Sequence, residues 1–183
     1  PNQTRHILSA WTVEAMIKPA VGEDDGGVLI TNLLSNGDLN YELGLRLESG
    51  ALVPYARFDN RETDGSIRSY SVGANTTHDP ALGVWHVWLK DSSFLIPLET
   101  WTHVAATFEP ETGELNLYVA GDLVAQRSRL TVLANHAAGL ASGVSVGGPL
   151  DGIGDGSDSD LYFGGLMDEV RIWNEVRSLT EIQ

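Results

Sequence analysis

The chain lacks cysteine entirely and has few basic residues, and both shortages exclude classes of function. Without cysteine, its 183 residues can hold no disulfide, no thiolate metal site and no cysteine nucleophile. Its 11 lysines and arginines are outnumbered by 25 aspartates and glutamates, which gives a net charge of −14. A nucleic-acid-binding protein needs a basic surface to neutralise phosphates, so the composition argues against nucleic acid as a partner.

Long apolar runs are also missing. None approaches the roughly 20 residues that a membrane-spanning helix needs, so membrane insertion is not expected. Residues 1–10 contain no apolar core of a signal peptide, which indicates a mature chain or a piece of a longer one. Because no internal repeat or linker interrupts the sequence, we expect one domain over residues 1–183.

Alternation of apolar and polar residues dominates what is present. In WTVEAMIK, residues 11–18, every second side chain is apolar, which predicts a half-buried strand that ends at Pro19. Further strands are predicted at residues 28–34, 41–47, 51–58, 67–72, 84–89, 101–108, 115–119, 123–127 and 144–146, with a last one within 161–173. The intervening residues 73–83 are rich in turn formers. Many short strands with almost no helical periodicity predict an all-β sandwich.

The end of the chain carries a different signal. Ser178 is followed three residues later by Glu181, the spacing of a capping box, in which each residue bonds a backbone amide of the other. This pattern predicts a short helical turn over residues 178–182. The full expectation is a two-sheet antiparallel β-sandwich with a C-terminal helical turn.

Three segments, taken in order, resemble the laminin-G-like superfamily, and specifically the concanavalin-like jelly rolls close to pentraxins. They are WTVEAMIKP at 11–19, LETWTHVAATFEPETGELNLYVAGDLVA at 98–125 and FGGLMDEVRIWNEVRSLTEI at 163–182. The resemblance implies a jelly roll of two antiparallel sheets with a non-catalytic adhesive or glycan-binding role, outside the cell or at its surface. Two departures stand out: only ten residues precede the first segment, and the insert at 78–95 is longer than usual.

The loop PLDGIGDGSDSD, residues 149–160, is the sharpest candidate for a metal site. Calcium prefers six to eight hard oxygens, and this loop combines carboxylates with glycines that free the backbone carbonyls. Its candidate ligands are Asp151, Asp155, Asp158 and Asp160. The resemblance implies that the earlier loop 35–40 adds Asp38 and Asn40. Pro149 and Leu150, however, occupy positions where pentraxins carry ligands, and the alternative is a solvated acidic loop.

A second calcium position is implied at Asp168, in the segment LMDEV. Related sandwiches often use this aspartate for a structural calcium at the sheet edge, together with backbone carbonyls near the N-terminus. The alternative is that the Asp168 carboxylate bonds backbone amides at the start of a strand.

Exposed aromatic side chains offer a carbohydrate platform, because the apolar faces of sugars stack on them. Trp85, Trp88 and Tyr70 lie in or near the variable region and are the candidates. The alternative for Trp85 and Trp88 is packing of the insert onto the sandwich. The remaining tryptophans, Trp11, Trp101 and Trp173, are predicted to be core residues.

Catalysis has little support in the sequence, which has no G-x-S-x-G, no H-E-x-x-H and no strand with alternating catalytic carboxylates. Our first hypothesis is therefore a calcium-supported binding or adhesion module that recognises a glycan or an extracellular protein. The second is a structural domain of a surface layer or filament, which contacts other copies of itself or other domains of a larger protein. A glycosidase or lyase is the third.

Overall fold

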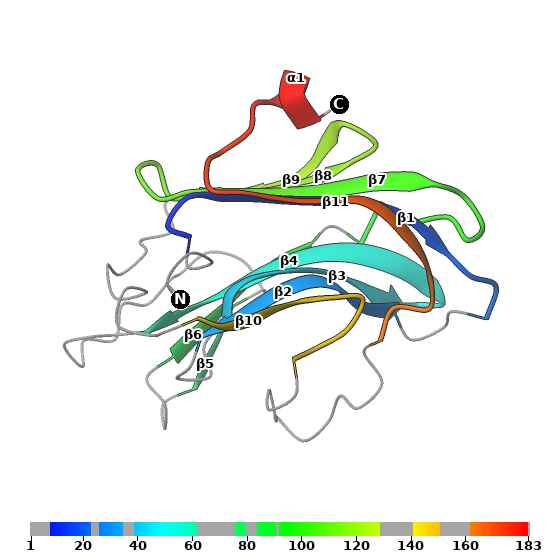
Figure 1. The fold of residues 1–183 in the computed structure, drawn as a ribbon, viewed down its shortest axis with the longest axis horizontal. Coiled ribbons are helices and arrows are strands. Elements are labelled where there is room, and N and C mark those ends of the chain that lie inside the picture. The colour runs from blue at the N-terminus through cyan, green and yellow to red at the C-terminus, as the bar shows by residue number, and fades with distance from the viewer. Residues whose placement is uncertain are drawn as a thin grey trace.

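The computed structural model describes residues 8–22, 26–34, 39–61, 76–79, 84–90, 92–128, 141–150 and 162–182. This part of the chain forms two antiparallel sheets stacked face to face, with a short helix on the outside of one of them (Figure 1). The predicted all-β sandwich with a C-terminal helical turn is therefore confirmed. No described helix is long and apolar enough to cross a membrane.

The first sheet has five strands in the order β11-β1-β7-β8-β9. They are β1 (Trp11–Pro19), β7 (Thr102–Glu109), β8 (Glu114–Val119), β9 (Asp122–Arg127) and β11 (Gly165–Trp173). The second sheet has six strands in the order β10-β2-β3-β4-β6-β5. They are β2 (Gly26–Leu34), β3 (Leu39–Glu48), β4 (Ala51–Arg61), β5 (Thr76–Asp79), β6 (Val84–Lys90) and β10 (Ala141–Val146), and the helix α1 spans Leu179–Ile182.

The core fills the space between the sheets and follows the predicted alternation. In β1 the side chains of Val13 and Ile17 are fully buried, and they face Leu43 and Leu45 of the other sheet within one apolar cluster. Trp11 also belongs to this cluster, as predicted. Apolar burial of this kind contributes about 25 cal/mol for each Å² removed from water, and it is what holds the two layers together.

A close backbone contact joins the edge of the six-stranded sheet to the chain that enters β11. A Cβ added to Gly27 would lie 2.5 Å from Phe163 Cα, so this approach requires glycine. Phe163 in turn donates its amide to the Gly147 carbonyl at 3.1 Å. The approach fixes the point from which β11 crosses to the five-stranded sheet.

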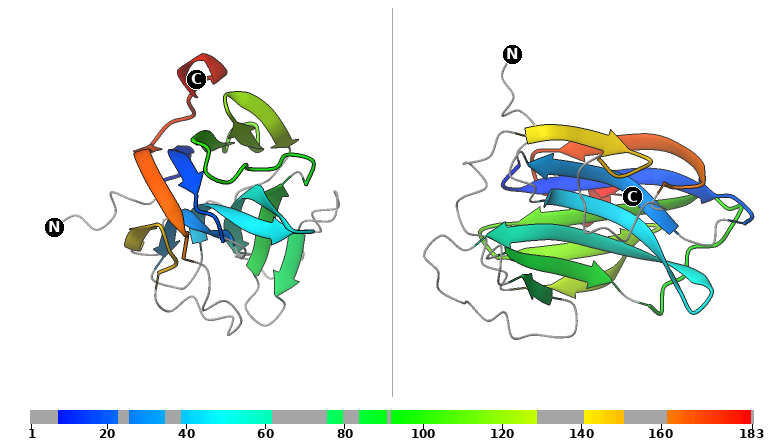
Figure 2. Two further views of the ribbon diagram at one scale, coloured as in Figure 1. Left: turned by 90° about the vertical axis from the view of Figure 1, so that its right-hand side faces the viewer. Right: turned by 90° about the horizontal axis from the view of Figure 1, so that it is seen from below.

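The C-terminal segment folds back over the outer face of the five-stranded sheet, where α1 lies above the strands (Figure 2). Thr12 Oγ1 donates to the Glu175 carbonyl at 2.8 Å and accepts the Arg177 amide at 2.9 Å. Ile182 of α1 is buried against Ala105 and Tyr118. As a result Thr12 is fully buried although it points away from the core.

The predicted strands differ from the described ones by a few residues at their ends, and one described strand was not predicted. Residues 76–79 form β5 at the edge of the six-stranded sheet, where the sequence indicated only turns. These residues lack the alternation of apolar and polar side chains that predicts a strand. They are extended because their backbone pairs with β6. The strand predicted at residues 67–72 lies outside the described residues.

Candidate ligand-binding groove

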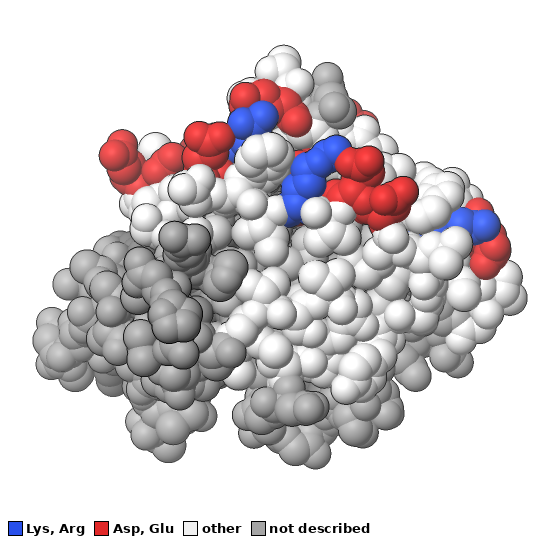
Figure 3. Space-filling view, viewed as in Figure 1, with Lys and Arg blue, Asp and Glu red and all other residues white. Residues whose placement is uncertain are grey.

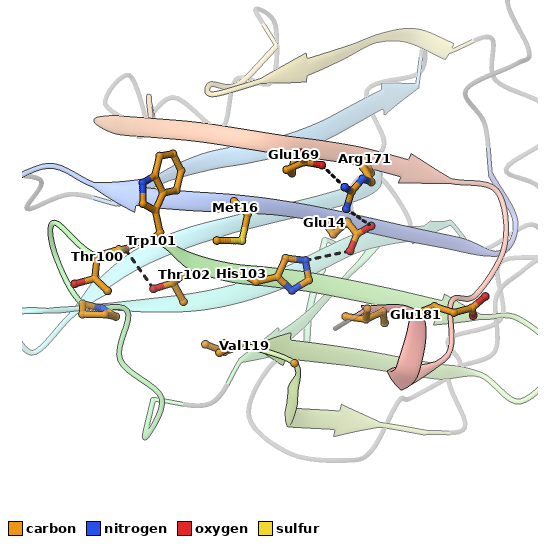
Figure 4. Close-up of a pocket in the computed structure, with 14 residues that line it drawn as sticks. Glu14, Met16, Thr100, Trp101, Thr102, His103, Val119, Glu169, Arg171 and Glu181 are labelled. Atoms are coloured by element: carbon orange, nitrogen blue, oxygen red, sulfur yellow. Dashed lines mark hydrogen bonds and ion pairs between the residues drawn. The ribbon is translucent and has the colours of Figure 1, made fainter.

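A groove of about 940 Å³ lies on the outer face of the five-stranded sheet (Figure 4). Its floor is formed by outward-facing residues of β1 and β7, one wall by β11, and the opposite wall by the turn between β8 and β9. The loop before β7 and the helix α1 close its two ends. The lining residues are Glu14, Met16, Pro97, Thr100, Trp101, Thr102, His103, Val119, Ala120, Gly121, Glu169, Arg171, Glu181 and Ile182.

A buried carboxylate marks the polar end of the groove. Glu14 is 3% exposed although it belongs to the outward set of β1. Its Oε1 accepts a hydrogen bond from Trp173 Nε1 at 2.9 Å, and its Oε2 lies 3.0 Å from His103 Nε2. Arg171 Nη1 lies 3.7 Å from Oε1. A buried carboxylate is costly without partners, and these three groups on two neighbouring strands provide them.

A β-bulge in β11 brings two more charges to this wall. The register of β11 against β1 shifts between Glu14 and Met16, and Glu169 there adopts a left-handed backbone with φ of 50°. Bulges of this kind redirect side chains at the edges of sheets. The Glu169 carboxylate forms an ion pair with Arg171, which also faces Glu14 (Figure 4).

The opposite end of the groove is aromatic. Trp101 is 45% exposed, so the prediction that it belongs to the core is wrong. It precedes the first residue of β7 and therefore escapes the alternation that buries the strand. The preceding loop is held at Glu99, whose amide donates to the Pro19 carbonyl at 2.8 Å and whose carboxylate contacts Lys18 Nζ at 3.1 Å. The hydrogen bond from Lys18 lowers the pKa of Glu99.

The helical end of the groove is held by the Glu181 half of the predicted capping box, because the Ser178 hydroxyl donates to Glu181 Oε2 at 2.7 Å instead of accepting the Glu181 amide. Glu181 Oε2 accepts the Ser178 amide at 2.8 Å, and this hydrogen bond lowers the pKa of the Glu181 carboxyl. Glu181 Oε1 also lies 3.3 Å from Arg177 Nη2, and the Arg177 guanidinium stacks 4.4 Å from the ring of Trp173. Trp173 is half-buried on this outer face and is not part of the core cluster between the sheets.

The outer face of the six-stranded sheet carries a second buried carboxylate. Glu42 of β3 accepts a hydrogen bond from the Tyr55 hydroxyl of β4 at 3.0 Å. Burial raises the pKa of Tyr55 well above its ordinary value, so the hydroxyl keeps its proton. Further along, Glu48 pairs with Lys90 and accepts the Ser92 hydroxyl at 2.6 Å. The strand register places Trp88 opposite Arg57 on β4.

Most of the predicted calcium ligands lie outside the described residues, and their role stays a prediction. These are Asp38, Asp151, Asp155, Asp158 and Asp160. The chain leaving β10 bends back on that strand, because Leu150 Cδ2 lies 3.7 Å from the position of a Cβ on Gly143.

The structure describes Asn40 and Asp168, and each has a backbone partner. The Asn40 amide accepts from the Leu8 N–H at 2.8 Å and donates to the Leu8 carbonyl at 2.9 Å. The Asp168 carboxylate accepts the Glu169 amide at 2.8 Å, which is the backbone-bonding alternative for this residue. The described residues contain no cluster of three or more histidine or carboxylate side chains suited to a metal. Their donor set alone does not fit a calcium ion.

The side chains of the predicted aromatic platform lie outside what the structure describes. Trp85 and Trp88 belong to β6 in the six-stranded sheet, and the structure describes only their backbone. Tyr70 lies outside the described residues. The groove is instead on the other sheet, and the aromatic residue that lines it is Trp101.

Sequence reasoning missed Glu14, His103 and Arg171 as a cluster. All three lie in the segments that carry the family resemblance, but Glu14 and His103 are 89 residues apart in the sequence and Arg171 lies further along the chain. A charged residue at an outward position of β1 was visible in the sequence. Which residues lie near Glu14 depends on the antiparallel register, which places Arg171 opposite Glu14 and His103 opposite Met16, two residues further along β1.

Charge is distributed unevenly over the surface. On the face in Figure 3, the described acidic and basic side chains gather over the five-stranded sheet and the C-terminal segment, and the described area below them is free of charge. The groove lies on the same sheet as these charged side chains.

Two stacked antiparallel sheets with a groove of mixed aromatic and polar lining define a lectin-like binding module. The chain belongs to the concanavalin A-like lectin/glucanases superfamily, because the family model Laminin_G_3 matches residues 1–183. The resemblance noted in the sequence is therefore confirmed.

Curated relatives match half of the chain. The pentraxin-related protein PTX3 of Bos taurus is 32% identical over 91 residues, and that of Mus musculus is 29% identical over 91 residues. Each match covers 49% of this chain and 23% of the relative. The chain therefore spans about a quarter of the length of the curated relatives that it matches.

Solved structures share the fold at low identity. A heptameric SAP-like pentraxin from Limulus polyphemus has a TM-score of 0.62 at 17% identity, covering 96% of this chain and 68% of its own. A Ruminococcus gnavus sialidase CBM40 bound to α2,3-sialyllactose has a TM-score of 0.61 at 16% identity, covering 96% and 81%. Domains LG4-5 of the mouse laminin α1 chain give 0.51 at 13% identity, covering 96% and 38%.

Proposed function

We propose that this chain is a non-catalytic recognition module, located outside the cell or at its surface, whose ligand is a glycan or another protein. The observation that carries the proposal is the groove, where the half-exposed Trp101 and the buried Glu14 lie in one cavity large enough for a small ligand. Concave sites with an apolar surface and a few fixed polar groups are typical of ligand binding. A fold shared with a carbohydrate-binding module supports a glycan in particular.

A glycan array tests this proposal directly. The chain should bind at least one glycan, and the Trp101→Ala variant should lose that signal. Because Trp101 is only about half-buried and lies outside the core, its removal should lower the unfolding temperature only slightly. An array on which the folded chain binds nothing would contradict glycan recognition and leave a protein ligand as the form to test.

We also propose that calcium supports the module through the loops at 35–40 and 149–160. Four aspartates in a glycine-rich loop, close in sequence to the bend at Leu150, support this assignment. Thermal unfolding should then shift to higher temperature when calcium replaces a chelator, because an ion that binds only the folded state stabilises it. An unchanged unfolding temperature at millimolar calcium would count against the site.

Hydrolysis is the alternative that the family description raises, since the superfamily includes glucanases. Glycosidases use two carboxyl groups about 5–9.5 Å apart, one that donates a proton and one that attacks the sugar or activates water. In the groove, Glu14 is held by Trp173 and His103, and Glu169 is paired with Arg171. We therefore expect no product from a polysaccharide panel, and product that disappears in Glu14→Gln would overturn this expectation.

Self-assembly is the second candidate function, and exposed apolar side chains at one end of the sandwich favour it. Phe94, Leu95 and Leu98 are all exposed in the loop before β7, and Val21, whose amide donates to Glu99 at 3.1 Å, is exposed beside them. Apolar groups gathered in this way often mark a protein contact. Sedimentation over a wide concentration range should show oligomers that Leu95→Ser and Leu98→Ser reduce, whereas a monomer throughout would contradict assembly.

A further inference from the structure

The lining of the groove carries more negative than positive groups, and this excess narrows the class of ligand. Glu14, Glu169 and Glu181 provide three carboxylates, and Arg171 provides the lining guanidinium. That guanidinium already faces two of the carboxylates. The chain as a whole carries a net charge of −14. A ligand with a carboxylate or sulfate would therefore meet like charge in the groove, because Arg171 already faces two carboxylates and His103 already contacts Glu14.

The two ends of the groove are held rigidly before any ligand arrives. At one end the loop that carries Trp101 is fixed through Glu99, by its backbone bond to Pro19 and its contact with Lys18. At the other end Trp173 and His103 hold the Glu14 carboxylate in place. Preorganised groups lose little freedom on binding, so they favour a ligand that fits both ends.

The distance between these ends excludes a single sugar ring as the whole ligand. The register pairs Ile17 with Thr102 and Glu14 with Ala105, so Trp101, the residue before Thr102, lies four residues along the chain from the position opposite Glu14. At about 3.3 Å per residue this separation is roughly 13 Å along the strands. Met16 and His103 line the floor between the two ends (Figure 4).

We infer that the groove binds an uncharged oligosaccharide, with one ring stacked on Trp101 and hydroxyls of a later ring bonded by Glu169 and Arg171, the exposed groups beside the buried Glu14. Carboxylate oxygens accept hydrogen bonds from the hydroxyl groups of a sugar, whereas the Arg171 guanidinium donates hydrogen bonds to the hydroxyl oxygens. Neighbouring hydroxyls of a neutral sugar satisfy both kinds of partner without adding charge. This inference rests on the proposed glycan recognition and adds the ligand class and its position.

The test uses an array in which each uncharged oligosaccharide is paired with its sialylated or sulfated counterpart, followed by calorimetry on the best pair. The neutral member should bind at least about threefold more tightly than the acidic one, and added salt should narrow the difference by screening. Trp101→Ala should weaken binding about tenfold or more. Phe94→Ala removes an exposed aromatic ring outside the groove and serves as the matched control, with unchanged affinity.

Glu169→Gln isolates the role of charge. It removes a largely exposed carboxylate beside Arg171 and should raise the affinity for the acidic member relative to that for the neutral one. Tighter binding of acidic glycans by the unchanged chain, still lost in Trp101→Ala, would overturn the neutral class but keep the recognition function. Glycan binding that survives Trp101→Ala would overturn the position. An array with no binder would remove the glycan function itself.

Discussion

The two outer faces of the sandwich each bury a glutamate, and the structure uses the two residues differently. Glu14 of β1 is 3% exposed and Glu42 of β3 is 4% exposed, and both point away from the core. Glu14 is contacted by side chains of β7 and β11 and lines a groove beneath the C-terminal segment. Glu42 accepts a hydrogen bond from Tyr55 on the adjacent strand. The role of an outward residue thus depends on what covers it.

The largest expected effect is the loss of the Glu14 carboxylate. In Glu14→Ala the indole N–H of Trp173, the imidazole of His103 and the guanidinium of Arg171 lose their common acceptor. Removing one partner from such a buried cluster costs about 3–5 kcal/mol. Urea unfolding followed by tryptophan fluorescence should show this loss of stability.

The isosteric variant Glu14→Gln separates charge from packing. Its amide oxygen can still accept from Trp173, so we expect it to retain most of the stability that Glu14→Ala loses. If Glu14→Ala were as stable as the unchanged chain, the cluster would have no structural role. The contrast between the two outer faces would then disappear.

On the six-stranded face the corresponding change is Tyr55→Phe. It removes the hydroxyl that donates to Glu42 at 3.0 Å and leaves a buried carboxylate short of one donor. The free energy of unfolding should fall by about 1–3 kcal/mol. Tyr162→Phe, at a largely exposed tyrosine, is the control and should stay within about 0.5 kcal/mol. Equal effects in the two variants would show that the Glu42 bond adds nothing.

The C-terminal segment that covers the groove face is tested through Thr12. Thr12→Val keeps the shape of the side chain but removes the hydroxyl that bonds Glu175 and Arg177, which should cost about 1–2 kcal/mol. Hydrogen exchange should increase in residues 174–182 specifically. Thr107→Val is the matched control, because Thr107 is equally buried on the same face but accepts a long 3.4 Å bond from Asn116. Similar exchange in both variants would contradict a specific clamp.

The sequence predicted the layers well because alternation reports directly on burial. Val13 and Ile17 fell on the core side of β1, and the spacing of Ser178 and Glu181 located the helical turn. Alternation does not say what lies over the other side of a strand. Thr12 and Glu14 look like solvent-facing residues until the C-terminal segment and the flanking strands are placed over them.

The groove could not be read from the sequence for the same reason. Its polar end combines residues from β1, β7 and β11, which only the register brings together. Trp101 looked like the first apolar residue of a strand, and it is exposed because the strand begins one residue later. The calcium prediction depends on loops whose residues are largely outside the described part of the chain, so it stays a prediction.

The smallest expected effect is on the pH dependence of the free energy of unfolding, which two ion pairs influence: Glu48 with Lys90 and Glu99 with Lys18. Hydrogen bonds from Lys90 and Ser92 lower the pKa of Glu48, which lies at the end of β3. A carboxyl whose folded pKa is below its unfolded value stabilises the fold above the unfolded pKa, near 4.3, and loses that contribution as the pH falls through the folded value. Glu48→Gln should therefore cost less than about 1 kcal/mol at pH 7, and the difference should shrink as the pH falls below the unfolded pKa.

Glu99 provides the comparison on the groove side, because Lys18 lowers the pKa of its carboxyl in the same direction. Its side chain is more exposed than that of Glu48, 50% against 19%, so solvent screens its ion pair more strongly. Urea unfolding at pH 7, 5, 4 and 3 should show a smaller acid-dependent change for Glu99→Gln than for Glu48→Gln. The reverse order would mean that the Glu99 contact, which fixes the loop carrying Trp101, holds the groove more firmly than its exposure indicates.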